Sequence, residues 1–100
     1  MEKIVVKLFI AGHTSSSERA VSSLHRICDS DPDHDFEISV IDVLEQPQLA
    51  EEARILATPT LIKELPLPVR RLIGDLSDEE KVLVGLDVQI DNMTDRNKNE

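Results

Sequence analysis

The pattern of apolar and polar positions in the first half of the chain predicts a strand, a helix and a second strand. Ile4 to Ile10 is an apolar run with one charge, typical of an interior strand, and Ala11-Gly12 ends it. A helix follows, because apolar residues recur on one face at positions 20, 21, 24, 27 and 28. Phe36 to Val43 then alternates apolar and polar residues, as a half-buried strand does. Strands joined in this way are expected to be parallel.

Ser15 and Glu18 predict where the first helix begins. In a capping box of this spacing, the hydroxyl and the carboxylate each accept a hydrogen bond from an otherwise unpaired backbone N–H. The helix gives way to Asp29 to Asp35, which is polar and reads as a solvated loop. Alternating aspartates at 29, 31, 33 and 35 also suggest calcium, but the EF-hand glycine and closing Glu are absent, so no metal site is assigned.

A second helix is predicted after Pro47, because a first helical turn tolerates a residue without a backbone N–H. Apolar residues at 49, 53, 56 and 57 follow helical spacing and predict that this helix ends near Thr58-Pro59. Thr60 to Leu65 then reads as a strand, bounded by Pro66 and Pro68.

The last third of the chain supports two structures. Val69 to Ile73 fits both a helical face and a short strand. Val82 to Ile90 alternates like a strand, yet the same residues fit a helix that a second capping box, Ser77 with Glu80, would start. Gly85 weakens the helical alternative without forbidding it, because glycine inside a helix costs about 0.5–1 kcal/mol relative to alanine.

A half-chain with two possible packings is a candidate for fold switching, in which the two states differ by only a few kcal/mol. Short segments are often ambiguous in this way, so the pattern alone favours ordinary ambiguity. The predicted domain spans residues 1–90, and residues 91–100 are polar without periodicity, as in a disordered tail.

Composition narrows the possible functions. Hydrophobic residues make up 40% of the chain and charged residues 31%, which suits one globular domain with an aliphatic core. The formal net charge of -9 repels nucleic-acid backbones and anionic lipid, so neither partner is expected. Lys7 interrupts the apolar start, and no stretch reaches the roughly 18 apolar residues of a membrane span.

Cysteine and histidine offer little chemistry. Cys28 is the single cysteine and cannot form an intramolecular disulfide, so we expect a cytoplasmic protein. His13, His25 and His34 lack metal-ligand spacing and read as loop or exposed-helix residues. We therefore assign no catalytic residue, cofactor or metal.

Segments spread over residues 3 to 90 carry a family likeness. They read KLFIAG (7–12), VIDVL (40–44), PQLAEE (47–52), ILATPTL (55–61), PVRRLIGDLS (68–77) and EKVLVGLD (80–87). Together they resemble the KaiB family of circadian clock proteins of cyanobacteria and their bacterial relatives.

The resemblance implies a non-enzymatic α/β protein with two folds that share a thioredoxin-like β-α-β first half. The ground state follows the order βαββααβ and forms a tetramer or dimer. The rarer state is a thioredoxin-like βαβαββα monomer that binds the ATPase ring of KaiC. The conflicting patterns fall where the family switches, which favours switching over ordinary ambiguity.

The resemblance also implies two partner-binding surfaces for a KaiC-like ATPase, for which a SasA-type histidine kinase would compete. One is a basic cluster, although such residues are more often simply solvated: Lys63, Arg70 and Arg71. The other lies on the helix after Pro47: Gln48, Glu51, Glu52, Arg54 and Ile55. Two departures limit the resemblance. Ser39 stands where clock members typically have Lys, which puts contact with KaiA in doubt, and the usual Pro-Pro-Pro run is Pro66-Leu67-Pro68.

Thioredoxin kinship assigns Thr58-Pro59-Thr60 to the segment where thioredoxins hold a cis-proline before a strand. Isomerisation of X-Pro bonds takes tens to hundreds of seconds, so a switch that changed proline isomers would be slow. The residues expected to govern switching are Pro59, Pro66, Pro68, Gly85 and Asp87.

Two competing function classes are a redox enzyme and a SasA-type sensor domain. Redox catalysis is not expected, because Gly12 to Ser17 lacks the two cysteines of a thioredoxin and Cys28 lies a helix away. A SasA-type sensor domain shares the opening fold but lacks the Gly85-Leu86-Asp87 segment of the switching family. A KaiB paralogue, related to stress and acting without KaiA, is the nearest alternative.

Overall fold

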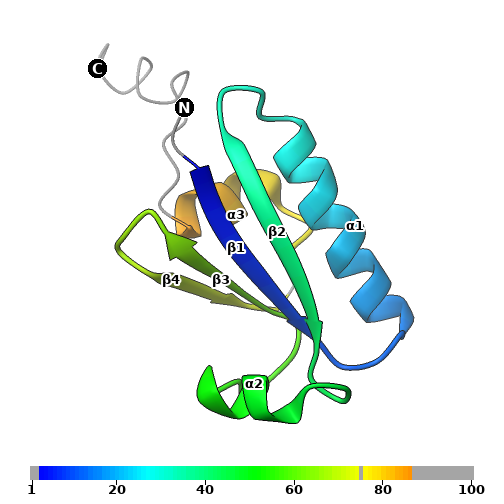
Figure 1. Cartoon of the computed structure of the whole chain (residues 1–100). Helices are drawn as coiled ribbons and strands as arrows, with labels where there is room; N and C mark the ends of the chain where they lie inside the picture. Colours follow the sequence, from blue (N-terminus) through cyan, green and yellow to red (C-terminus); the bar gives the residue numbers. More distant parts are fainter. Residues whose placement is uncertain (1–2, 75, 87–100) are drawn as a thin grey trace.

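A four-stranded sheet in the order β2-β1-β3-β4 forms the centre of the protein (Figure 1). The computed structural model describes residues 3–74 and 76–86. Strand β1 is parallel to β2 and antiparallel to β3, and β3 is antiparallel to β4. The elements are β1 (Lys3–Ile10), α1 (Ser15–Asp29), β2 (Asp35–Asp42), α2 (Pro47–Glu52), β3 (Thr60–Leu65), β4 (Arg70–Ile73) and α3 (Glu79–Gly85).

Of the two arrangements expected for the second half of the chain, the structure has the thioredoxin-like one. Its order α2-β3-β4-α3 completes the series β-α-β-α-β-β-α, so the predicted fold class is confirmed. Residues 70–73 form a strand, whereas residues 79–85 form a helix. Up to Leu86, the alternating pattern of Val82 to Ile90 therefore does not form a strand. Helix α3 and its C-cap bury Val82, Leu83 and Leu86 on one side instead. Asp87 and the tail 91–100 lie outside the described residues.

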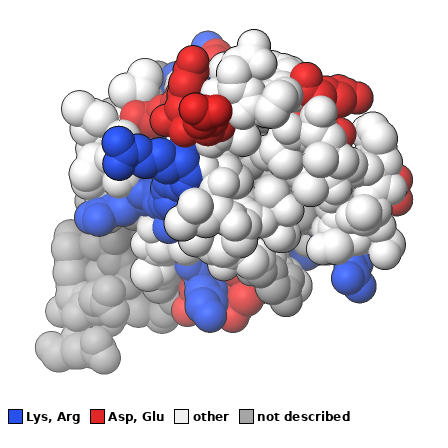
Figure 2. Space-filling model, turned by 90° about the horizontal axis from the view of Figure 1, so that it is seen from below, with Lys and Arg blue, Asp and Glu red and all other residues white. Residues whose placement is uncertain are grey.

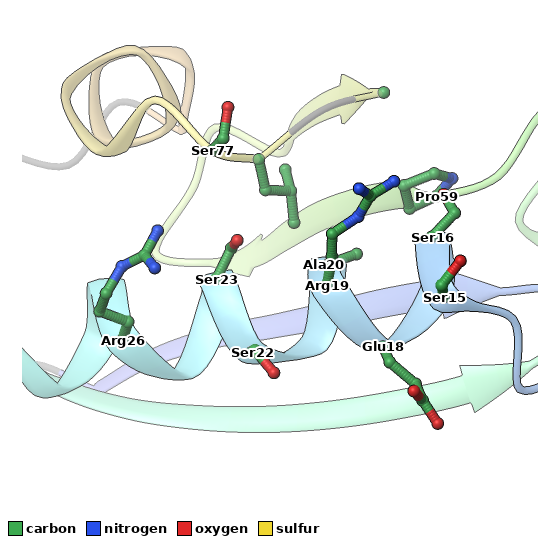
Figure 3. Close-up of a pocket in the computed structure, with 12 residues that line it drawn as sticks. Ser15, Ser16, Glu18, Arg19, Ala20, Ser22, Ser23, Arg26, Pro59 and Ser77 are labelled. Atoms are coloured by element: carbon green, nitrogen blue, oxygen red, sulfur yellow. The ribbon is translucent and has the colours of Figure 1, made fainter.

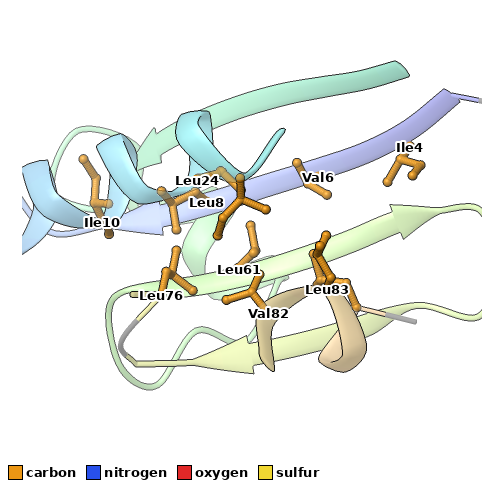
Figure 4. Close-up of a cluster of buried hydrophobic side chains, with 12 residues drawn as sticks. Ile4, Val6, Leu8, Ile10, Leu24, Leu61, Leu76, Val82 and Leu83 are labelled. Atoms are coloured by element: carbon orange, nitrogen blue, oxygen red, sulfur yellow. The ribbon is translucent and has the colours of Figure 1, made fainter. Parts of the chain in front are cut away.

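The larger core lies on the sheet face covered by α1 and α3 (Figure 4). Alternate residues of β1 point to this face, and they meet side chains of both helices and of β3. The buried members are Ile4, Val6, Leu8, Ile10, Ala20, Leu24, Ile27, Leu61, Leu76, Val82, Leu83 and Leu86. Because α1 and α3 share this core, the two halves of the chain are packed into one unit.

A smaller core lies on the opposite face, beneath α2. Phe9, Ile41 and Ile62 are buried there, and half-buried side chains from α2 and the segments beside it pack against them: Val43, Leu49, Ala53 and Ile55. This cluster fixes α2 beside the C-terminal ends of β1 and β2. None of the helices among the described residues is long and apolar enough to cross a membrane.

Both helix starts lie next to the predicted capping boxes rather than in them. Thr14, not Ser15, is the N-cap of α1, and its hydroxyl accepts the Ser17 N–H at 3.0 Å. Asp78, not Ser77, is the N-cap of α3, and its carboxylate accepts the Lys81 N–H at 3.1 Å. Thr and Asp are both strong N-caps, so the same physics acts at a neighbouring residue.

Helix α2 ends earlier than the apolar spacing predicts. After Glu52 the chain forms a Schellman cap: Ile55 N–H donates to the Ala50 carbonyl at 2.9 Å, and Arg54 N–H to the Glu51 carbonyl at 3.1 Å. Arg54 takes the left-handed conformation with φ +56°, at a cost of about 1–2 kcal/mol for a residue other than glycine. Leu56 is 96% exposed, so it does not share a buried helix face with Leu49 and Ala53, although its spacing predicted that it would.

All three prolines expected to govern switching follow cis peptide bonds. These are Thr58-Pro59, Leu65-Pro66 and Leu67-Pro68. The cis-proline expected before β3 from thioredoxin kinship is thereby confirmed at Pro59.

Gly85 makes a close contact that the sequence did not reveal. A Cβ atom at Gly85 would lie 2.5 Å from Cδ2 of Leu72 and 3.1 Å from its Cδ1. The absence of a side chain therefore lets α3 approach β4 closely. Alanine at position 85 would raise the helix propensity of α3, but Leu72 must move to accept it.

We predict that Gly85→Ala and Leu72→Ala are energetically coupled. With Leu72 present, the helix-propensity gain of about 0.5–1 kcal/mol is offset by the displaced Leu72 side chain. In a Leu72→Ala background, the gain appears in full, so Gly85→Ala raises the free energy of unfolding of the thioredoxin-like form. Urea unfolding of the four proteins of this double-mutant cycle gives the coupling. Strictly additive effects would contradict the contact.

Candidate protein-docking surface

The polar face of α2 and its cap form an exposed surface at one end of the sheet. Gln48, Glu51, Glu52 and Arg54 are all exposed. Ile55 is half-buried and packs against the smaller core, so it anchors this surface from beneath. Of the predicted helix residues, four therefore lie at the surface and Ile55 holds the segment in place.

The predicted basic cluster divides between the two faces of the sheet. Lys63 pairs with Arg70 across β3 and β4, and Ile62 pairs with Arg71. Because side chains alternate along a strand, Lys63 and Arg70 share the face of α1 and α3, whereas Arg71 lies on the face of α2. Lys63 is only 1% exposed, so the prediction that it belongs to a surface cluster is wrong for this arrangement.

Arg71 joins the surface of α2 through two hydrogen bonds. Its Nη2 donates to the carbonyl of Ala53 at 2.7 Å, and its Nη1 to the carbonyl of Arg54 at 3.1 Å. One residue of the predicted basic cluster is thus brought against the other predicted surface. Figure 2, seen from the α2 end, shows one group of Lys and Arg side chains beside a group of Asp and Glu, with other basic side chains apart from it. We use the name docking surface for the candidate protein-contact region formed by Gln48, Glu51, Glu52, Arg54, Ile55 and Arg71.

The position of a thioredoxin dithiol is occupied by other groups. Thr14 and Ser15 stand at the start of α1, where Thr14 serves as the N-cap. Cys28 lies near the other end of that helix and packs against the larger core. Its burial, with Asp29 and Asp31 nearby, raises the pKa of the Cys28 thiol to about 12. The thiol is therefore neutral and a poor nucleophile at physiological pH.

Asp42 closes the loops at the C-terminal ends of β1 and β2. Its Oδ1 accepts the Gly12 N–H at 3.0 Å and the Leu44 N–H at 2.9 Å. These bonds, first that of Gly12 and then that of Leu44, lower the pKa of the Asp42 carboxyl below its usual value, and nearby His13 adds to the effect.

His13, Asp42 and Glu45 come together at these loops, with one possible ligand atom from each within 4.8 Å of the others. Sequence reasoning missed this cluster, because its members follow different strands. The predicted parallel pairing of the first two strands could have indicated it, because their C-terminal ends lie at the same edge of the sheet. Asp42 already has a structural role there, and two of the three residues are exposed, so the cluster is no evidence of a metal.

A groove of about 840 Å³ runs along α1 (Figure 3). Arg19, Ser23 and Arg26 lie along its floor, and Ser77 faces them from the opposite side. Pro59 and Gly74 also line the groove. None of the residues of the docking surface lines it, so the two features are separate.

The fold and the start of α1 define a class: a thioredoxin-like domain without the redox dithiol. The structure is similar to the N-terminal domain of SasA from Synechococcus elongatus, with a TM-score of 0.72 and 28% identity over 89% of this chain and 88% of that one. It also shares its fold with mitochondrial thioredoxin 3 of Saccharomyces cerevisiae, with a TM-score of 0.65 and 22% identity over 87% and 79% of the two chains.

Sequence comparison gives the family. The KaiB domain family matches residues 7–88. A circadian clock oscillator protein KaiB from a Synechococcus strain is 58% identical over 84% of this chain and 82% of its own length. Circadian clock protein KaiB3 from Synechocystis is 51% identical over 88% of this chain and 86% of its own. The chain belongs to the KaiB family, a non-enzymatic family of circadian clock proteins, as the sequence segments indicated.

We predict that Cys28 resists alkylation. With a thiol pKa of about 12, only about one molecule in ten thousand carries the thiolate at pH 8. Iodoacetamide labelling of the native protein, followed by mass spectrometry, is therefore far slower than labelling in 6 M urea. Equal rates in the two conditions would contradict the burial of this thiol.

We predict that Asp42→Ala destabilises the protein at neutral pH. The folded-state pKa of Asp42 is lowered, so its stabilising effect is present above the unfolded-state value of about 3.9 and is lost as the pH falls through the folded value. Wild type and Asp42→Ala therefore converge in urea midpoint towards pH 2. Asp42→Asn is the matched control, since its amide oxygen still accepts hydrogen bonds without titrating. A gap between wild type and Asp42→Ala that did not vary with pH would contradict this role.

Proposed function

We propose that this protein is a non-enzymatic clock adaptor that docks, in its thioredoxin-like form, onto a KaiC-like ATPase. The docking surface is that of α2, its cap and Arg71. Docking follows a switch from an oligomeric ground state, and it makes the protein a slow regulator of the phosphorylation state and output of the ATPase.

One observation carries the proposal: the second half adopts the thioredoxin-like order although residues 82–90 also have the pattern of a strand. Membership of the KaiB family supports it, since the relatives are named as circadian clock oscillator proteins. The exposed polar face of α2 supports it as well, because it offers charged and amide groups to a partner from a position fixed by the smaller core.

The mechanism is a population shift. If a fraction f of the molecules has the binding fold, the apparent Kd is the intrinsic Kd divided by f. Binding then draws the equilibrium towards the thioredoxin-like form by mass action. Association is limited by the conversion between folds, and this gives the protein its function as a delay element.

A second candidate is a sensor or interaction domain of the SasA type. It is favoured by the similarity to the SasA N-terminal domain, which extends over 88% of that domain. The higher identity to KaiB proteins, 51–58% in the relatives compared, supports the clock adaptor instead. The similar match to KaiB3 also keeps a KaiB paralogue that acts without KaiA as a variant of the first proposal.

We predict that association with a KaiC-like ATPase ring is slow and saturable. Biolayer interferometry with this protein immobilised and the ring in solution gives an observed rate that reaches a plateau as the concentration of the ring rises, because conversion between the folds becomes limiting. In a Leu72→Ala background, Gly85→Ala raises the bound amplitude above that of Leu72→Ala alone. A rate that rose linearly over the whole range would contradict conversion as the limiting step.

We predict that Glu52→Lys weakens this binding about tenfold, as expected for a charge reversal within an interface. Asp33→Lys is the matched control, because it changes the charge equally in an exposed loop before β2, at the other end of the sheet from α2. If the two substitutions weakened binding equally, either the interface would lie elsewhere or binding would depend only on the net charge of the protein.

A further inference from the structure

The end of α2 is held from outside the helix. Its cap places Arg54 in the left-handed conformation that glycine usually adopts. Helix α2 has only six residues, and Gln46 provides no side-chain cap at its start. A helix this short depends on contacts with the rest of the protein.

Arg71 supplies the contact at this end. Arg71 belongs to β4, and the whole of β3 lies between α2 and β4 in the sequence. Its two terminal nitrogens donate to the carbonyls of Ala53 and Arg54 at 2.7 and 3.1 Å. The planar guanidinium matches two neighbouring acceptors, and its positive charge lies at the negative end of the helix.

We propose that Arg71 is a positioning residue for the docking surface: it holds the end of α2 and the left-handed Arg54 in place against β4. This inference rests on the proposed function. Both terminal nitrogens of Arg71 donate to the cap of α2, so Arg71 orients backbone and side chains that a partner would meet. Because the contact joins α2 to β4, it is available only where these two elements lie side by side.

The first test needs no partner. In amide hydrogen exchange by NMR, followed on the signals of the monomeric thioredoxin-like form, Arg71→Gln lowers the protection of the Arg54 and Ile55 amides about tenfold, because the cap loses two charge-assisted bonds. Arg71→Lys gives an intermediate loss, since an ammonium group lacks the planar pair of donors. Arg26→Gln is the matched control, with the same charge change on α1. Unchanged protection in Arg71→Gln would overturn the proposal.

The second test separates positioning from direct contact with the partner. Arg71→Gln weakens binding to the KaiC-like ATPase ring about tenfold, and Gln46→Ser, added as a new N-cap for α2, recovers most of that loss. Recovery follows only if Arg71 acts through α2. If Gln46→Ser restored amide protection but not binding, Arg71 would be a partner contact and the proposal would fail.

The two proposals fail in different ways. If wild-type protein did not bind the ATPase ring at all, the proposed function would fall, while the exchange data would still decide whether Arg71 positions α2. If the ring bound wild type and Arg71→Gln equally although protection at the cap was lost, α2 would not be the docking element. In that case the positioning role would be overturned independently.

Discussion

The antiparallel pairing of β3 with β1 is the interaction on which the second half of this protein depends. Strand β3 is buried from Thr60 to Lys63, and its alternating side chains supply Leu61 to the larger core and Ile62 to the smaller one. The same alternation assigns Lys63 and Arg71 to opposite faces of the sheet. A shift of this pairing by one residue would exchange the two faces, and Arg71 would no longer reach α2.

The described contacts couple the docking surface to the state of the fold. Arg71 on β4 supports α2 on one face of the sheet, while Leu72, the next residue, packs against Gly85 of α3 on the other. Strand β4 is thus in contact with both elements that distinguish the thioredoxin-like order. If α3 changed into another structure, β4 would lose its contact with Gly85 on one face. The hydrogen bonds of Arg71 to the cap of α2 on the other face would then lose their support.

The protein has a thioredoxin-like fold without the groups that give thioredoxins their chemistry. Thr14 and the serines at the start of α1 replace reactive cysteines, and burial keeps Cys28 neutral. Membership of a non-enzymatic clock family agrees with that reading of the site.

The sequence by itself determined β1, α1, β2 and β3. Strand β1 is a continuous apolar run, α1 and β2 have apolar residues about four or two positions apart, and β3 is bounded by prolines. The sequence also determined the family. Only the tertiary structure decided that Arg54 ends α2, that residues 79–85 are helical, and that Lys63 is buried while Arg71 binds the cap of α2. These features depend on contacts between residues far apart in the chain, and a local pattern does not specify which of two compatible packings forms.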